Sequence, residues 1–72
     1  IYGFTRHAEK EMAKDGMNNM DAIAVLRAGA VQPCEFESGS FRYRVLTKRM
    51  AVVIEFRSQS HLVVVTAWRI KQ

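Results

Sequence analysis

The sequence lacks the features that mark disulfide-rich, zinc-binding and membrane-spanning chains. Its single cysteine, Cys34, has no second cysteine with which to form an internal disulfide or a multi-cysteine zinc site. Apolar runs such as 51–54 and 62–65 are far shorter than the roughly 20 residues that a transmembrane helix needs. Hydrophobic residues make up 49% of the chain and charged residues 25%, a balance typical of a folded globular domain. We therefore expect one small domain over residues 1–72, with no membrane span.

Negative charge is also scarce, above all in the second half of the chain. Eleven Lys and Arg residues stand against seven Asp and Glu residues, which gives a net charge of +4 and a pI near 9.7. All but one of the acidic residues lie at or before Glu37. A positive field of this kind attracts polyanions at long range, and basic residues also populate the predicted strands. We therefore expect RNA or another nucleic acid as partner, rather than a membrane surface.

The first residues predict a helix between a capping residue and a glycine. Thr5 is a suitable N-cap, and Gly16 is a usual residue after the end of a helix. Between them Phe4, Ala8 and Met12 recur every four residues and form one apolar stripe.

A second helix is expected shortly after Gly16. Asn18 or Asn19 is its N-cap, and Gly29 follows its last turn. Its buried side is expected to carry Met20, Ile23 and Leu26, which recur at helical spacing. Because so few residues join the two helices, they are expected to form an antiparallel pair.

From residue 31 onward, apolar and polar residues alternate with the period of a β-strand. The expected strands run over 31–37, 41–45, 50–57 and 61–70. The breaks between them are short enough to allow only antiparallel hairpins, and Pro33, which has no amide donor, places the first strand at a sheet edge. The sequence therefore predicts an α+β fold in which two N-terminal helices pack on a four-stranded antiparallel β-meander.

Alternation along the middle strands predicts a charged sheet face. Arg42 and Arg44 share one face, and Phe41 and Tyr43 point the other way, toward the expected core. Glu55 and Arg57 on the next strand are expected on the arginine face. The pattern also fits an ordinary solvent-exposed face held by salt bridges.

The last strand leaves two interpretations open, because both of its faces are apolar at the centre. In the first, Thr66 and Trp68 join the arginine face, and Trp68 is free to stack on a base. In the second, Trp68 belongs to the core and Arg69 joins the arginines.

Several short motifs, in the same order along nearly the whole chain, resemble the small bacterial family DUF4258. They are Arg6-His7-Ala8, Met12, Ala22-Ile23, Leu26, Gly29, Gly39, Phe41-Arg42-Tyr43 and Val64-Val65-Thr66. That family is similar to the RelE-like, barnase-like and EndoU-like toxin ribonucleases, which share the BECR fold of helices followed by a four-stranded antiparallel sheet. The resemblance implies metal-independent RNA cleavage without a cofactor, and restraint by an antitoxin or immunity protein. It also implies that His7, one of Arg42 or Arg44, and Thr66 are polar active-site residues, and of the two arginines we take Arg44 as catalytic.

The chemistry of metal-free RNA cleavage fits the same residue types. The reaction needs a base for the 2′-hydroxyl, an acid for the leaving 5′-oxygen and cations that stabilise the phosphorane. Histidine titrates near neutral pH and suits either proton transfer, which favours His7. Arginine keeps its charge and donates two hydrogen bonds to a phosphate, which favours Arg44 and then Arg42.

Other residues have supporting roles in this hypothesis. Arg42, Arg57 and Trp68 are expected to bind the RNA, and Glu55 is a possible general base, with a simple ion pair as the alternative. We expect no metal site, because His7 and His61 have no neighbours at ligand spacing. Cys34 is expected to serve packing rather than catalysis.

The leading prediction is thus a metal-independent endoribonuclease of bacterial toxin type that acts in the cytoplasm. Delivery as the C-terminal part of a larger secreted toxin is an alternative route to that compartment. A non-catalytic RNA- or protein-binding module on the same scaffold is the second interpretation. A partner-binding domain of a larger protein, which would use an exposed strand edge, is the third.

Overall fold

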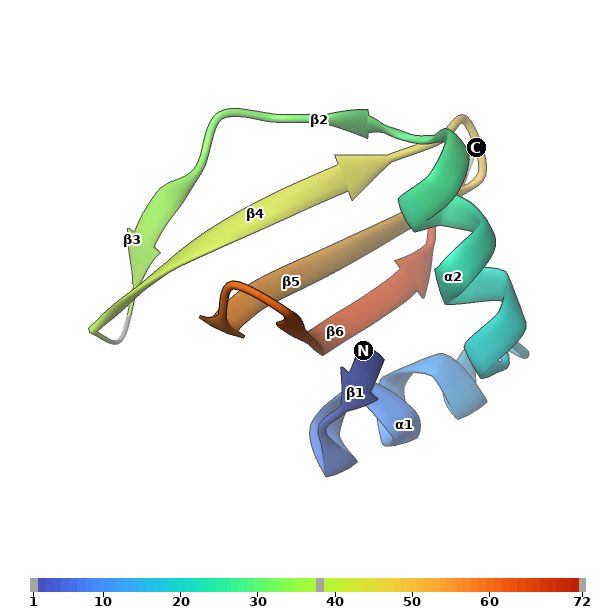
Figure 1. Cartoon of the computed structure of the whole chain (residues 1–72). Coiled ribbons are helices and arrows are strands. Elements are labelled where there is room, and N and C mark those ends of the chain that lie inside the picture. The colour runs from blue at the N-terminus through green and yellow to red at the C-terminus, as the bar shows by residue number, and fades with distance from the viewer. Residues whose placement is uncertain (1, 38, 72) are drawn as a thin grey trace.

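In the computed structural model, which describes residues 2–37 and 39–71, two helices lie on one face of a six-stranded sheet (Figure 1). The elements in chain order are β1 (Tyr2–Phe4), α1 (Arg6–Lys14), α2 (Asn19–Ala28), β2 (Ala30–Val31), β3 (Glu35–Glu37), β4 (Ser40–Leu46), β5 (Met50–Ser58) and β6 (His61–Arg69). The fold is α+β with two N-terminal helices, as the sequence predicts. The sheet, however, has more strands than the expected four-stranded meander.

The strand order is β1-β6-β5-β4-β2, and β3 also pairs with β4. The antiparallel ladder from β4 through β5 to β6 confirms the expected hairpins. One addition is β1, which pairs in parallel with β6 and was not expected. The other difference is that the expected strand over 31–37 is split into β2 and β3, on either side of Pro33. Proline cannot donate to the ladder, so pairing stops there, and both pieces lie at the sheet edge as expected.

Thr5 joins β1 to α1 and confirms the predicted N-cap. Its hydroxyl oxygen accepts a hydrogen bond from the amide of Ala8 at 3.0 Å, which caps the helix. The same hydroxyl donates to the carbonyl of Val65 at 3.2 Å, and the Thr5 amide donates to the carbonyl of Val64 at 3.1 Å. Helix α1 therefore begins at the edge of β6, held by both backbone and side chain.

The C-terminal end of α1 is tied to the end of β6. The amide of Arg69 donates to Asp15 Oδ2 at 2.8 Å, and its Nε donates to the carbonyl of Asp15 at 2.8 Å. Gly16 follows with φ of +68°, the left-handed conformation expected for a glycine that ends a helix. Both ends of α1 are thus fixed to the same strand.

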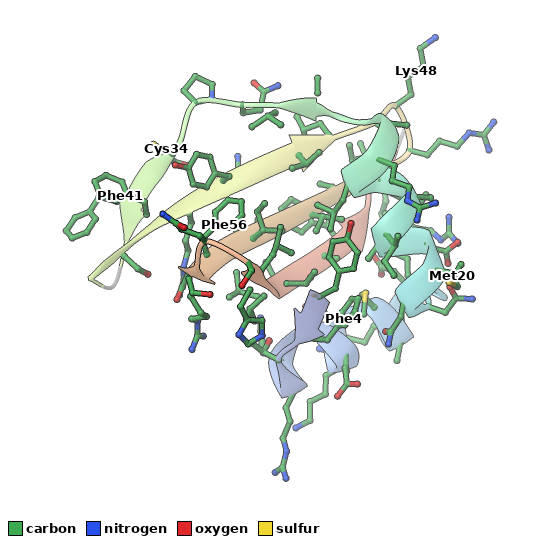
Figure 2. The ribbon with its side chains drawn as sticks, viewed as in Figure 1. Phe4, Met20, Cys34, Phe41, Lys48 and Phe56 are labelled. Carbon is green, nitrogen blue, oxygen red and sulfur yellow. The ribbon has the colours of Figure 1, made fainter. Side chains whose placement is uncertain are left out.

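Helix α2 begins with a reciprocal capping box between Asn18 and Asp21. Its buried residues are Ala22 and Val25, whereas Met20, expected on the buried side, is 70% exposed and points away from the sheet (Figure 2). The expectation for Met20 was wrong because the helix packs on the sheet through the face that carries Ala22 and Val25. The small Ala22 allows a close approach there, and Met20 lies on a different face of the helix.

The hydrophobic core lies between the helices and one face of β4, β5 and β6. Its buried members are Ala8, Met12, Met17, Ala22, Val25, Val45, Val52, Ile54, Val64 and Ala67. Burial of each large side chain in this set contributes about 1.5–3 kcal/mol. In the part of the chain that is described, neither helix is long and apolar enough to cross a membrane.

Four aromatic residues extend this sheet face beyond the helices, and we call them the aromatic strip. Phe36 pairs with Phe41 at 4.9 Å between ring centroids, and Tyr43 meets Phe56 edge-on at 5.8 Å. Phe36, Phe41 and Phe56 are all more than half exposed, and Figure 2 shows Phe41 at the end of the sheet farthest from the helices. The expectation that Phe41 is a core residue was therefore wrong, because the helices do not reach this end.

Candidate functional site

The side of β4, β5 and β6 that faces away from the helices forms what we call the open face. Its side chains lie in three cross-strand rows, set by the register of the ladder. The rows are Arg42–Glu55–Val63, Arg44–Val53–Thr66 and Leu46–Ala51–Trp68. Cations from β4 and polar or aromatic side chains from β6 therefore share one surface, with β5 between them.

A β-bulge in β6 decides which face the end of that strand presents. Ile54 pairs with Val64 but Val53 pairs with Thr66, so Val65 is an extra residue in the strand. Without it, Thr66 and Trp68 would share the core face of Val64. With it, both join the arginine face, which is the first of the two interpretations left open by the sequence. Simple alternation cannot reveal this bulge, because no glycine or proline marks it.

Arg44 and Trp68 form a cation–aromatic pair on the open face. The guanidinium carbon of Arg44 lies 5.9 Å from the centroid of the Trp68 ring, within the range of a cation–π contact. Arg44 is exposed and Trp68 is half-buried, so the pair remains accessible. Glu35 lies 3.9 Å from Arg44, but both side chains are well exposed and such a pair contributes little. The Arg44 charge is therefore largely available to a ligand.

Glu55 is the centre of an ion-pair cluster on the same face. Its carboxylate lies 2.9 Å from Arg57 Nε and 3.4 Å from Arg42 Nε, which confirms the expected neighbours. A hydrogen bond from the Ser40 side chain, with the charges of Arg57 and Arg42, holds the pKa of Glu55 below its ordinary value, although burial acts in the opposite direction. A lowered pKa makes the carboxylate a weaker proton acceptor. The geometry therefore favours the ion pair over the general base.

Ser40 is a residue of this cluster that the sequence reasoning missed. It lies two positions before Arg42 on β4, so the alternation that places the arginine on the open face places Ser40 there too. That signal was present in the sequence but weak, because an isolated serine beside a turn usually indicates the turn alone.

His7 lies outside the open face, near the start of α1. It is exposed, and it forms no hydrogen bond or salt bridge with another residue that the structure describes. Because Thr5 is bonded to the carbonyls of Val64 and Val65, this end of α1 lies at the β6 edge, close along the chain to Thr66. Arg44 lies two strand spacings further in, about 10 Å across the sheet. The start of α1 and the backbone before Thr66 thus lie near one edge of the sheet. However, α1 packs on the core face and Thr66 points to the open face, and no hydrogen bond or ion pair joins His7 to Thr66 or to the arginines.

The remaining candidates belong neither to the Arg44–Trp68 pair nor to the Glu55 cluster. Arg69 is turned toward α1 and does not join the arginines. His61 is exposed at the start of β6, near Gly3 of the edge strand. Cys34 is exposed, so the expectation that it serves packing was wrong. Within residues 2–37 and 39–71, no three His, Cys, Asp or Glu side chains gather as metal ligands would.

Comparison of the chain with protein-family models, with curated proteins and with solved structures finds no match in any of the three. The resemblance to the DUF4258 family therefore stays a prediction from sequence motifs. Any assignment of function has to rest on the geometry of the open face and on the chemistry of its residues.

Proposed function

We propose that this protein is a metal-independent endoribonuclease of bacterial toxin type that binds RNA on its open face. The observation that carries the proposal is the juxtaposition of Arg44, which shares a cross-strand row with Thr66, and Trp68 in the adjacent row. A guanidinium that binds phosphate, beside an aromatic ring on which a base stacks, is the combination typical of sites that bind single-stranded RNA. The net charge of +4 adds long-range attraction for the same ligand.

In the proposed reaction, RNA lies across the open face with a base on Trp68 and its scissile phosphate near Thr66. Arg44 stabilises the negative charge of the phosphorane, and Thr66 donates a hydrogen bond to the same group. His7 is the proton-transfer group. It takes the 2′-hydroxyl proton as the 2′-oxygen bonds to phosphorus, and it returns a proton to the 5′-oxygen as the bond between that oxygen and phosphorus breaks. Arg42 and Arg57 attract the adjoining backbone, although their pairing with Glu55 reduces the charge they offer.

The proposal includes an antitoxin or immunity protein as partner and the cytoplasm as the compartment where RNA is cleaved, with delivery as part of a larger secreted toxin as the alternative route. Two features support a protein partner. Strands β2 and β3 leave an unpaired edge on the side away from β4, interrupted by Pro33. Beside that edge, Phe36 and Phe41 are 66% and 58% exposed, which is unusual for large apolar side chains that face only water.

The test is expression of the wild-type chain and of His7→Ala from a tightly controlled promoter, with growth and total RNA followed together. We expect the wild type to arrest growth and fragment RNA, and His7→Ala to do neither, because the proton-transfer group is lost. His61→Ala is the matched control, since it removes the other exposed histidine and should behave like the wild type. Intact RNA and normal growth with soluble wild-type protein would refute the nuclease.

A second candidate function is a non-catalytic RNA-binding module. Two observations favour it. His7 lies apart from the arginines, and the Glu55 carboxylate is already paired with Arg42 and Arg57, so neither proton-transfer candidate is in contact with the accessible Arg44. RNA binding by purified protein that is unchanged in His7→Ala and produces no fragments would select this function over cleavage. Binding of that kind would fall with increasing salt.

A further inference from the structure

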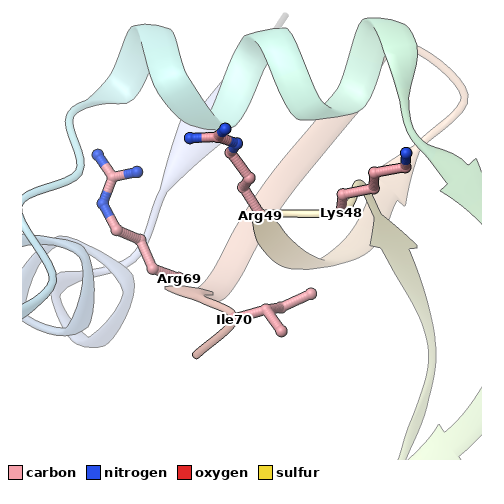
Figure 3. A pocket seen from close by; sticks show the side chains of 4 residues that line it. All are labelled: Lys48, Arg49, Arg69 and Ile70. Carbon is pink, nitrogen blue, oxygen red and sulfur yellow. The ribbon is translucent and has the colours of Figure 1, made fainter. Parts of the chain in front are cut away.

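A hollow with a volume of about 420 Å³ lies at the end of the sheet, between the β4–β5 turn and the end of β6 (Figure 3). Its lining is Lys48 and Arg49 from the turn between β4 and β5, and Arg69 and Ile70 from the end of β6. Three of these four side chains are cationic. Figure 3 shows Arg49 and Arg69 extending to the same side, so their positive charges face a common space.

Hydrogen bonds hold the two segments of the hollow together. The Thr47 hydroxyl accepts from the amides of Arg49 and Met50 at 3.3 and 3.1 Å, which fixes the turn. The amide of Ile70 donates to the carbonyl of Arg49 at 2.7 Å and joins the turn to β6. The backbone positions of the residues that line the hollow are therefore fixed by hydrogen bonds.

The charge of Arg69 is held in place without being neutralised by a direct salt bridge. Its guanidinium donates to the carbonyls of Asp15 and Gly16, while the Asp15 carboxylate accepts from the backbone amide of Arg69. Neither Arg49 nor Arg69 forms a salt bridge with another residue in the described ranges. Like charges gathered in one hollow repel each other, and an anion between them would relieve that repulsion.

The hollow adjoins the site of the proposed function. Trp68 directly precedes Arg69, and its row, Leu46–Ala51–Trp68, is close to the turn that carries Arg49. A nucleotide stacked on Trp68 would therefore send its backbone around the sheet end toward these cations, and Ile70 offers an apolar contact for the sugar. We propose that the hollow is a phosphate-binding subsite for the backbone of single-stranded RNA held on the open face.

This inference rests on the RNA-binding part of the proposed function and is independent of cleavage. It is tested by the binding of a fluorescently labelled single-stranded RNA to the wild type, Arg49→Gln and Lys10→Gln, measured by anisotropy over a range of salt concentrations. Lys10 is an exposed cation in α1, so its variant makes the same change in net charge away from the hollow. Circular dichroism checks that both variants are folded.

We expect Arg49→Gln to weaken binding roughly fivefold or more beyond the effect of Lys10→Gln, because a charge-assisted contact is lost. We also expect its salt dependence to fall by about 0.7 in the log–log slope, the amount that one phosphate contact on a single strand contributes. Equal affinities and slopes for the two variants would overturn the subsite alone. Binding without cleavage would overturn only the nuclease, and a wild type that does not bind RNA would overturn both.

Discussion

At the scale of single residues, Glu55 shows how the open face is stabilised. Its carboxylate accepts hydrogen bonds from Ser40 and Arg42 and forms an ion pair with Arg57, and these partners hold its pKa below the ordinary value of 4.5. A carboxyl whose pKa is lower in the folded than in the unfolded chain stabilises the fold when it is ionised in both states. That stabilisation is complete above the unfolded pKa and is lost as the pH falls through the folded pKa.

The variant Glu55→Gln should remove this pH dependence. We expect it to lower the midpoint of thermal unfolding at pH 7, and we expect its difference from the wild type to shrink as the pH falls below about 4.5. Glu35→Gln is the control, because it removes a well-exposed carboxylate from the same sheet and should have little effect. A difference between Glu55→Gln and the wild type that is constant from pH 7 to the acid range would contradict the assignment.

Residue patterns in the sequence were enough to find most of this cluster but not its chemistry. Alternation placed Arg42, Glu55 and Arg57 on one face, as the structure has them. The balance between base and ion pair depends on interatomic distances, which a sequence does not contain. The exposure of Met20 and Phe41 could not be predicted from the sequence either. Both are apolar, and whether an apolar side chain is covered depends on where the neighbouring helices end.

At the scale of elements, the contact between α2 and β4 depends on Gly29. A Cβ added there would lie 2.7 Å from both the carbonyl oxygen of Val25 and Cγ1 of Val45, and 2.9 Å from the carbonyl oxygen of Leu46. Two of these three neighbours are backbone atoms that cannot rotate away. The backbone conformation of Gly29 does not require a glycine, because its φ of −78° is open to other residues. The glycine is needed because the end of the helix lies so close to the sheet that a side chain would not fit.

Gly29→Ala should destabilise the protein by about 1–3 kcal/mol, the usual cost of an overpacked contact. Gly3→Ala is the matched comparison, because its new Cβ would meet the movable side chain of His61 at 3.3 Å. Urea unfolding of both variants measures the difference, and we expect a clear loss for Gly29→Ala and a small one for Gly3→Ala. Equal stability of the two variants would show that the helix end has room to shift.

The elements that the sequence predicted well are those with strong, unbroken periodicity. Both helices and the β4–β5–β6 hairpins were expected close to their observed bounds. The strand β1 was missed because its three residues are too few to show an alternation of apolar and polar side chains, and its partner β6 is distant in sequence. The bulge at Val65 was missed for a related reason, since it appears only in the pairing with β5.

At the scale of the whole molecule, positive charge gathers on the sheet and at one of its ends. The open face offers Arg44 beside Trp68, and the hollow at the sheet end adds Lys48, Arg49 and Arg69. Of the acids in the chain, only Glu55 lies beyond residue 37. Acidic residues thus gather on the helices and at β3, while most of the second half of the chain is basic, and for this reason we place RNA on the sheet rather than on the helices.

The central claim, that RNA binds on the open face, is tested most directly by the fluorescence of Trp68, which is the only tryptophan in the chain. Titration of the wild type with single-stranded RNA in the presence of a metal chelator should quench this fluorescence as a base stacks on the ring. Arg44→Gln should bind about tenfold more weakly, because the guanidinium that contacts phosphate is lost. Emission that RNA leaves unchanged, with equal affinity for the wild type and Arg44→Gln, would contradict the account.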